Sequence, residues 1–209
     1  MYYTYQNCTN LQEAVCGSNV INMYYTYAHC NNLISAVCGP NVKYMRGAYS
    51  HCDNLEKAVC DDNVIDMSGA YENCINLKYA ACGNNVTNMR YTYIYCSNLT
   101  EAICGPSVST MEGTYAYCTN LTTAICGNNV TGMSGTYQFC DSLKNAVCGP
   151  NVKYLTYCYI NCINLTEGAC GNNVTAFYGA YKDCPNLTNA VIGQKVNDVH
   201  ETFKNCVNL

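Results

Sequence analysis

Cysteine is the residue type in this chain with the widest choice of chemistry, at 19 of 209 residues. Thiols can form disulfides, ligate metals or act as nucleophiles. Eighteen of them fall into two series with a spacing of 22 residues, and Cys158 stands outside both. The first series is Cys8, Cys30, Cys52, Cys74, Cys96, Cys118, Cys140, Cys162, Cys184 and Cys206, and the second is Cys16, Cys38, Cys60, Cys82, Cys104, Cys126, Cys148 and Cys170.

The spacing of the two series decides between these chemistries. In a structure that repeats with the sequence, neighbours within a series lie about 5 Å apart, close enough for bonds such as Cys8–Cys30. A Cys8–Cys16 bond would have to cross the coil, and the odd total argues against a complete disulfide framework. Zinc needs convergent tetrahedral ligands, and no Cys-x2-Cys or Cys/His cluster is present. We expect free thiols packed as small buried hydrophobic groups, with disulfides between neighbouring units as the alternative.

Other catalytic groups are few. The three histidines are His29, His51 and His200, and none accompanies a nucleophile in a recognisable motif. Asp61-Asp62 is a carboxylate pair at an expected turn, and no glycine-rich phosphate loop follows a strand. We therefore expect no enzyme activity, no metal and no cofactor.

The composition excludes further classes of protein. Charged residues make up 11% of the chain, against about 25% in a typical domain. The net charge is -4 and the ten basic residues are scattered, so no nucleic-acid partner is expected. The sequence has no run of about 18 apolar residues, so membrane insertion is not expected. The first residues lack the basic and apolar regions of a signal peptide.

The whole chain follows a period of 22 residues. Leu recurs at the eleventh place of every unit, from Leu11 to Leu209, and Val recurs at the twentieth. The sequence predicts a single solenoid domain over 1–209, with nine repeats and a C-terminal half repeat at 199–209. The units begin at Met1, Met23, Met45, Met67, Met89, Met111, Met133, Leu155 and Phe177.

The most regular part of each unit reads Leu-x-x-Ala-[Val/Ile/Ala]-Cys-Gly. Alternation places Ala14 and Cys16 on one face of a short strand and Val15 on the other, and Gly17 ends the strand. The rest has too much Gly, Thr and Tyr for a stable helix, so we expect an extended or single-turn segment. The predicted fold class is a mainly β repeat solenoid with one short parallel strand per coil and little or no α-helix. Its shape would be a rod or shallow arc about 45 Å long.

This pattern resembles the leucine-rich repeat of treponemal-type, BspA-like surface proteins. That family's repeat reads roughly L-x-x-I-x-I-P-x-x-V-x-x-I, a small–aromatic pair and then C-x-x-L, and the resemblance covers the chain. This sequence departs from it in having Ala and Cys for Ile, Gly for Pro, and a unit about one residue shorter. The resemblance implies non-catalytic recognition, adhesion or spacing at a cell surface or virion, and similar arrays look like ones carried by phages.

Two polar residue types also form columns. The tyrosines from Tyr5 to Tyr181, with Phe203 last, stand where the family keeps its buried aromatic, and stacked rings would stabilise neighbouring coils. Asparagines such as Asn32 and Asn41 precede the Leu and the Val, and their amides are expected to bond the backbone of the next coil.

Two sets of outward residues are candidates for binding. The middle strand position should be polar on a half-buried strand, yet it is apolar in every repeat, which indicates a partner or self-association stripe or only sheet propensity. The stripe is Val15, Val37, Val59, Ala81, Ile103, Ile125, Val147, Ala169 and Val191. The second set is an exposed aromatic face suited to proteins or glycans, or merely tolerated there. It comprises Tyr2, Tyr3, Tyr24, Tyr25, Tyr91, Tyr95, Tyr117, Tyr157 and Tyr178.

Two functions remain open at this point. One is an extracellular solenoid that presents a repetitive surface to proteins or glycans. The other is a structural filament in which uncapped ends or stripes of two copies pair. Met1 already fits the repeat and Leu209 is a core position, which is expected either of such a filament or of a segment of a longer protein.

Overall fold

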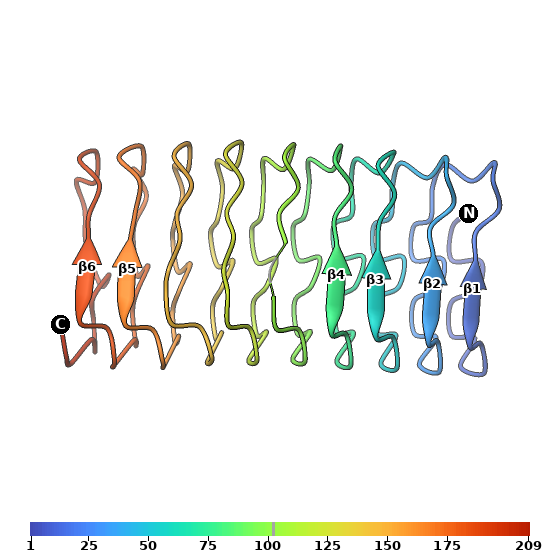
Figure 1. Cartoon of the computed structure of the whole chain (residues 1–209), viewed down its shortest axis with the longest axis horizontal. Helices are drawn as coiled ribbons and strands as arrows, with labels where there is room; N and C mark the ends of the chain where they lie inside the picture. Colours follow the sequence, from blue (N-terminus) through green and yellow to red (C-terminus); the bar gives the residue numbers. More distant parts are fainter. Residues whose placement is uncertain (102) are drawn as a thin grey trace.

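The computed structural model describes residues 1–101 and 103–209. Successive 22-residue units form successive coils that lie side by side along one axis, from the N-terminus at the right of Figure 1 to the C-terminus at the left. No helix occurs among the described residues. The expected rod-shaped, mainly β solenoid is confirmed.

In the described part of the chain, six strands of three residues each lie on one side of the rod. They are β1 (Glu13–Val15), β2 (Ser35–Val37), β3 (Lys57–Val59), β4 (Tyr79–Ala81), β5 (Glu167–Ala169) and β6 (Asn189–Val191). β1 pairs with β2, β3 with β4 and β5 with β6, all in parallel, and equivalent residues such as Glu13 and Ser35 are partners. The register follows from the repeat, because a one-residue slip would turn the inward alanines to solvent.

The pairing is weaker near the middle of the chain. Positions 123–125 and 145–147 take part only in the isolated bridges Glu101–Thr123 and Asn145–Glu167. In these coils a buried tyrosine hydroxyl donates to the strand carbonyl: Tyr137 to Ile125 at 3.1 Å and Tyr159 to Val147 at 2.7 Å. The same bond is made in a paired strand, since the Tyr27 hydroxyl donates to the Val15 carbonyl of β1 at 3.2 Å, so the core supplies this partner whether or not the strand is paired.

The other half of each coil is a run of turns, longer than the single turn expected from the sequence. Alternate backbone amides donate to the next coil, as from Tyr71 to the Thr92 carbonyl at 3.0 Å and from Asn73 to the Ile94 carbonyl at 2.8 Å. Asn73 has a φ of 57°, and His29 and His51 hold the same conformation at the same place in the repeat. Repeated left-handed residues turn the chain and keep its amides aimed along the rod.

The core consists of aligned columns, as the sequence predicted. Tyr27 to Tyr181 are buried, and the rings of neighbouring tyrosines stack at 5.1 to 5.7 Å between centroids. First-series thiols from Cys30 onward donate to the tyrosine carbonyl of the preceding coil at 3.0–3.2 Å. All the cysteines lie in the described part of the chain and are free. Their thiols therefore pack and donate weak hydrogen bonds.

The asparagine columns bond in the opposite direction to the one expected. The Asn41 amide donates to the Ser18 carbonyl and the Asn63 amide to the Pro40 carbonyl, each at 2.7 Å and each in the preceding coil. In the other column some amides bond one another, as Asn98 does to Asn76 at 3.3 Å. The direction follows from the turn, whose carbonyls point toward the following coil.

Second-series cysteines explain the glycine at the seventeenth place of every unit except the third, which has Asp61 there. A Cβ on Gly105 would lie 3.1 Å from the Cys82 sulfur and 2.9 Å from the Gly83 carbonyl oxygen of the preceding coil. A side chain there would force neighbouring coils apart. Glycine is thus needed for close approach as well as for ending the strand.

Candidate functional site

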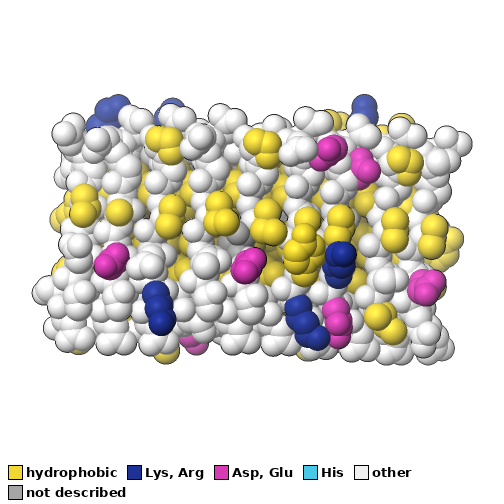
Figure 2. Space-filling model, in the orientation of Figure 1, with side chains coloured by type: hydrophobic (Ala, Val, Ile, Leu, Met, Phe, Trp, Pro, Cys, Tyr) yellow, Lys and Arg dark blue, Asp and Glu magenta, His cyan; other side chains and the backbone are white. Residues whose placement is uncertain are grey.

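The apolar stripe lies on the outer side of the strands. In the six strands the middle alanine or Gly168 points to the core, and the residues on either side of it are exposed except at Ala81, which ends β4. Val15 is 75% exposed and Val59 41%, whereas Ala81 and Ile103 are half-buried. Figure 2 shows the resulting row of hydrophobic side chains across the face that carries the strands.

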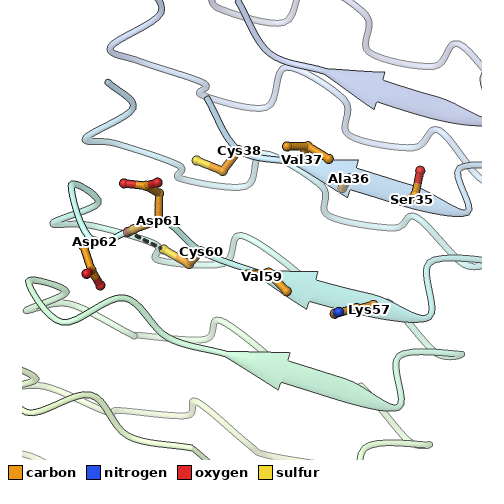
Figure 3. Close-up of a pocket in the computed structure, with 9 residues that line it drawn as sticks. All are labelled: Ser35, Ala36, Val37, Cys38, Lys57, Val59, Cys60, Asp61 and Asp62. Carbon is orange, nitrogen blue, oxygen red and sulfur yellow. Dashed lines mark hydrogen bonds between the residues drawn. The ribbon is translucent and has the colours of Figure 1, made fainter. Parts of the chain in front are cut away.

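A cavity of about 720 Å³ opens on this face between β2 and β3. Figure 3 shows Val37 and Val59 along its middle, Ser35 and Lys57 toward one end, and the two aspartates at the other. It is lined by Ser35, Ala36, Val37, Cys38, Lys57, Val59, Cys60, Asp61 and Asp62. The cavity is therefore an apolar trough with charged ends.

The cavity lies where the sheet is interrupted. β2 pairs with β1 and β3 pairs with β4, so β2 and β3 belong to different sheets. A second hollow of about 190 Å³ lies beyond β4, where Tyr79 and Ala80 meet Thr100, Glu101 and Ile103. The β3–β4 pair thus forms a ridge with a hollow on each side.

The charges at the ends of the trough are held in place. The Lys57 ammonium group lies 5.5 Å from the centre of the Tyr79 ring, within cation–π range. The Asp61 carboxylate accepts a hydrogen bond from the backbone amide of Asn63 at 3.1 Å. The Asp62 carboxylate accepts from the backbone amide of Asn84 at 2.8 Å and from its side-chain amide at 3.1 Å. Both charge signs are thus presented at fixed places along an apolar surface.

The two thiols in the trough are poor nucleophiles. Burial raises the pKa of Cys38 to about 11 and that of Cys60 to about 12. The thiolate is the reactive form, and at neutral pH both groups are almost wholly protonated. No group of three or more metal-ligating side chains is found within 1–101 and 103–209. The chemistry that the trough can offer is noncovalent contact.

The aromatic set is divided into separate groups, and several of its rings are covered. Tyr2, Tyr3, Tyr91 and Tyr95 are exposed, while the other five are half-buried. Tyr3 stacks on Tyr25 with 5.4 Å between centroids, and Tyr95 stacks on Tyr117 at 4.6 Å. Because stacking covers ring faces, these pairs present mainly ring edges and hydroxyls to a ligand.

Sequence reasoning located the stripe but not the trough. Lys57, Cys38 and Cys60 occupy ordinary repeat positions, and nothing in their types marks a gap between strands. One signal was available: Asp61-Asp62 replaces the Gly-x of the other units. That departure lies at the end of the trough.

In the described residues, no helix has the length and apolar character needed to cross a membrane. No curated protein matches the sequence.

Two of the solved structures that match share the fold with TM-scores above 0.5. A leucine-rich repeat protein from Bacteroides ovatus ATCC 8483 is 13% identical with a TM-score of 0.54, over 100% of this chain and 80% of that one. The leucine-rich repeat protein of T. pallidum is 18% identical with a TM-score of 0.57, over 85% and 76% of the two chains. A leucine-rich cell surface protein from Faecalibacterium prausnitzii A2-165 is 16% identical with a TM-score of 0.49, over 100% and 74%.

The family model described as a BspA type leucine rich repeat region, with six copies, matches residues 1–100, 45–166 and 91–209. These stretches together span every repeat, including the strands, the turns and the tyrosine and cysteine columns. The chain therefore belongs to the BspA-type leucine-rich repeat family.

Proposed function

We propose that this protein is a non-catalytic, extracellular recognition or adhesion solenoid that binds a partner protein through its strand face. The observation that carries this proposal is the trough between β2 and β3, set within the exposed apolar stripe. Apolar surface with fixed charges at its edges is the composition of protein interfaces, in which a hydrophobic centre gives affinity and a polar rim gives register.

The placement of the charges supports an extended partner segment. Lys57 and Ser35 lie at one end of the trough and Asp61 and Asp62 at the other, with Val37 and Val59 between them. A segment with apolar side chains in its middle and opposite charges at its ends would match all three parts. The extracellular location rests on the resemblance to BspA-like surface proteins.

An adhesion experiment tests the proposal. Beads coated with the chain are applied to a cell layer, and retention is measured for the wild type, Val59→Lys and Ile65→Lys. Ile65 is the matched control, because it is 37% exposed against 41% for Val59 but lies off the stripe. We expect Val59→Lys to lower retention at least tenfold and Ile65→Lys to leave it within twofold. Equal retention of the wild type and Val59→Lys would remove the strand face as the binding surface.

Self-assembly is the second candidate function, and the observation that favours it is the recurrence of the stripe in the same register on successive coils. Two copies could match their stripes along their length. Light scattering with negative-stain microscopy, with and without reductant, separates the candidates. A 23.0 kDa monomer would contradict self-assembly. Fibres that Val59→Lys and Ile103→Lys abolish would support it, and persistence of the fibres in reductant would exclude disulfides as their cause.

A further inference from the structure

Another cavity, of about 510 Å³, lies on the run of turns and results from an unusual column of residues. The third residue of every unit has a left-handed φ, between 48° and 63°. The column reads Tyr3, Tyr25, Gly47, Gly69, Tyr91, Gly113, Gly135, Tyr157, Gly179 and Glu201. Tyrosine and glycine thus share one backbone conformation along the rod.

The glycines of this column are of two kinds. A Cβ on Gly47 would overlap the Tyr25 ring, and one on Gly113 would overlap the Tyr91 ring, so these glycines make room for the preceding tyrosine. Gly69 comes after Gly47 in the column, so no tyrosine ring of the preceding coil lies over it. The atom nearest to a Cβ there would be a Glu72 carboxylate oxygen at 3.7 Å. Packing therefore does not require glycine at 69, and its missing side chain leaves the cavity open between Tyr25 and Tyr91.

The walls of the cavity carry balanced charge. Arg46 and Arg90 lie in the lining together with Asp66 and Glu72, beside Asn88 and the two tyrosines. Asp66 accepts from the Ser68 amide at 2.9 Å, Asn88 accepts from the Arg90 amide at 3.1 Å, and Arg90 pairs with Glu112. Within the described residues, Arg46 and Glu72 form no ion pair. They are therefore free to bond a ligand.

This lining selects a class of ligand. An anion would face two carboxylates and a cation would face two guanidinium groups, so charge disfavours both. A neutral molecule with many hydroxyls can donate to Asp66, Glu72 and Asn88 and accept from the two arginines. Its C–H surface can contact the exposed Tyr91, as orienting polar groups and apolar walls do in small-ligand sites. We propose that the Gly69 cavity is a saccharide-binding site, which goes beyond the proposed function because it lies on the turn segment and not on the strand face.

The chain contains its own matched control. Gly135 lies 66 residues further along, also follows a glycine, and has only Gln138 atoms near a Cβ position, at 3.5 Å and beyond. There Arg46, Asp66 and Arg90 are replaced by Glu112, Gly132 and Thr156. A tyrosine at either position would be followed in the column by another tyrosine, as Tyr3 is by Tyr25, and those two rings stack with 5.4 Å between centroids, so both variants are expected to fold.

The test uses ligand-observed NMR with a panel of neutral hexoses and N-acetylhexosamines as their methyl glycosides. We expect at least one sugar to bind the wild type, Gly69→Tyr to weaken binding at least tenfold, and Gly135→Tyr to change it less than twofold. Glu72→Gln, which changes no packing, is expected to weaken binding three- to tenfold. Val59→Lys is expected to leave binding unchanged, which separates this site from the strand face.

Three results would overturn the proposal. One is the absence of binding by every sugar in the panel at 20 mM, roughly the weakest affinity that such a site would usefully have. Another is equal weakening by Gly69→Tyr and Gly135→Tyr. The third is displacement of the bound sugar by inorganic phosphate or by a charged peptide but not by a second neutral sugar. That result would assign the cavity to another class of ligand.

Discussion

The two sides of each coil are joined to their neighbours in different ways. On the turn segment, Met89, Tyr91, Tyr93 and Tyr95 each donate a backbone amide to the next coil, and equivalent residues do so along the rod. On the strand face, the described residues pair in three separate two-stranded sheets, with a cavity between β2 and β3. The regular hydrogen bonds of the run of turns hold the stack together. Strand pairing on the opposite face can therefore differ from coil to coil.

The largest expected effect is a loss of stability at alkaline pH. The buried thiols and phenols of the core lose their protons at a higher pH than they do in the unfolded chain. Burial raises the pKa of Cys52 and that of Tyr27 to about 12, and it raises the pKa values of Cys96 and Tyr93 well above their usual range. In the unfolded chain, thiols titrate near about 8.5 and phenols near about 10. The unfolded chain therefore loses protons first, and the stability present below about pH 8.5 falls as the pH rises toward 12.

We expect urea midpoints to fall steeply between pH 8 and pH 10.5, with tyrosinate absorbance at 295 nm appearing together with the loss of circular dichroism. The fully reduced protein is used, so that disulfide formation does not contribute. A midpoint at pH 10.5 equal to that at pH 7 would show that the tyrosine and cysteine columns are not sealed from water.

A smaller effect separates core and stripe within one coil. Leu121 is fully buried, and Leu121→Ala is expected to lower the free energy of unfolding by about 2–5 kcal/mol, because it removes packed atoms and leaves a cavity. Ile125 is 49% exposed, and Ile125→Ala is expected to change the free energy of unfolding by about 0.5 kcal/mol or less. Urea unfolding of both variants measures the difference. Comparable losses would mean that the stripe supports the fold rather than being free for a partner.

The smallest effect tests the two arrangements of the tyrosine hydroxyls. The Tyr115 hydroxyl accepts from the Ile103 amide at 3.0 Å and donates to the Ile103 carbonyl at 2.5 Å. The Tyr93 hydroxyl is buried and has no partner in the described structure, and the Ala81 carbonyl accepts from the Cys60 amide of the preceding coil at 3.2 Å. Since a made hydrogen bond stabilises and an orphaned buried hydroxyl destabilises, Tyr115→Phe should lower the unfolding free energy by about 1 kcal/mol, whereas Tyr93→Phe should leave it equal or raise it.

Thermal unfolding of the two phenylalanine variants decides this point, since the substitutions are chemically identical and both rings are buried. A loss of stability in Tyr93→Phe as large as that in Tyr115→Phe would show that the Tyr93 hydroxyl has a hydrogen-bond partner after all.

The sequence by itself determined the period, the fold class and the buried columns. The Leu, Tyr and first-series Cys positions recur without an insertion, and a constant period allows equivalent side chains to stack on one another. The outward position of the stripe followed from alternation along a strand, because successive side chains point to opposite faces. The full run of turns was less visible, since left-handed backbone at Tyr and His carries no strong signal in residue type.

Only the tertiary structure decided where the cavities lie. Whether β2 pairs with β3 depends on the hydrogen bonds between the two coils, and Val37 and Val59 are the same residue type in either case. The Gly69 cavity likewise depends on which neighbour has a ring to cover it, since Gly47 and Gly69 are the same residue in the same backbone conformation. A repeat fixes what each coil is made of, but the contacts between particular coils fix which surfaces are filled and which are left open.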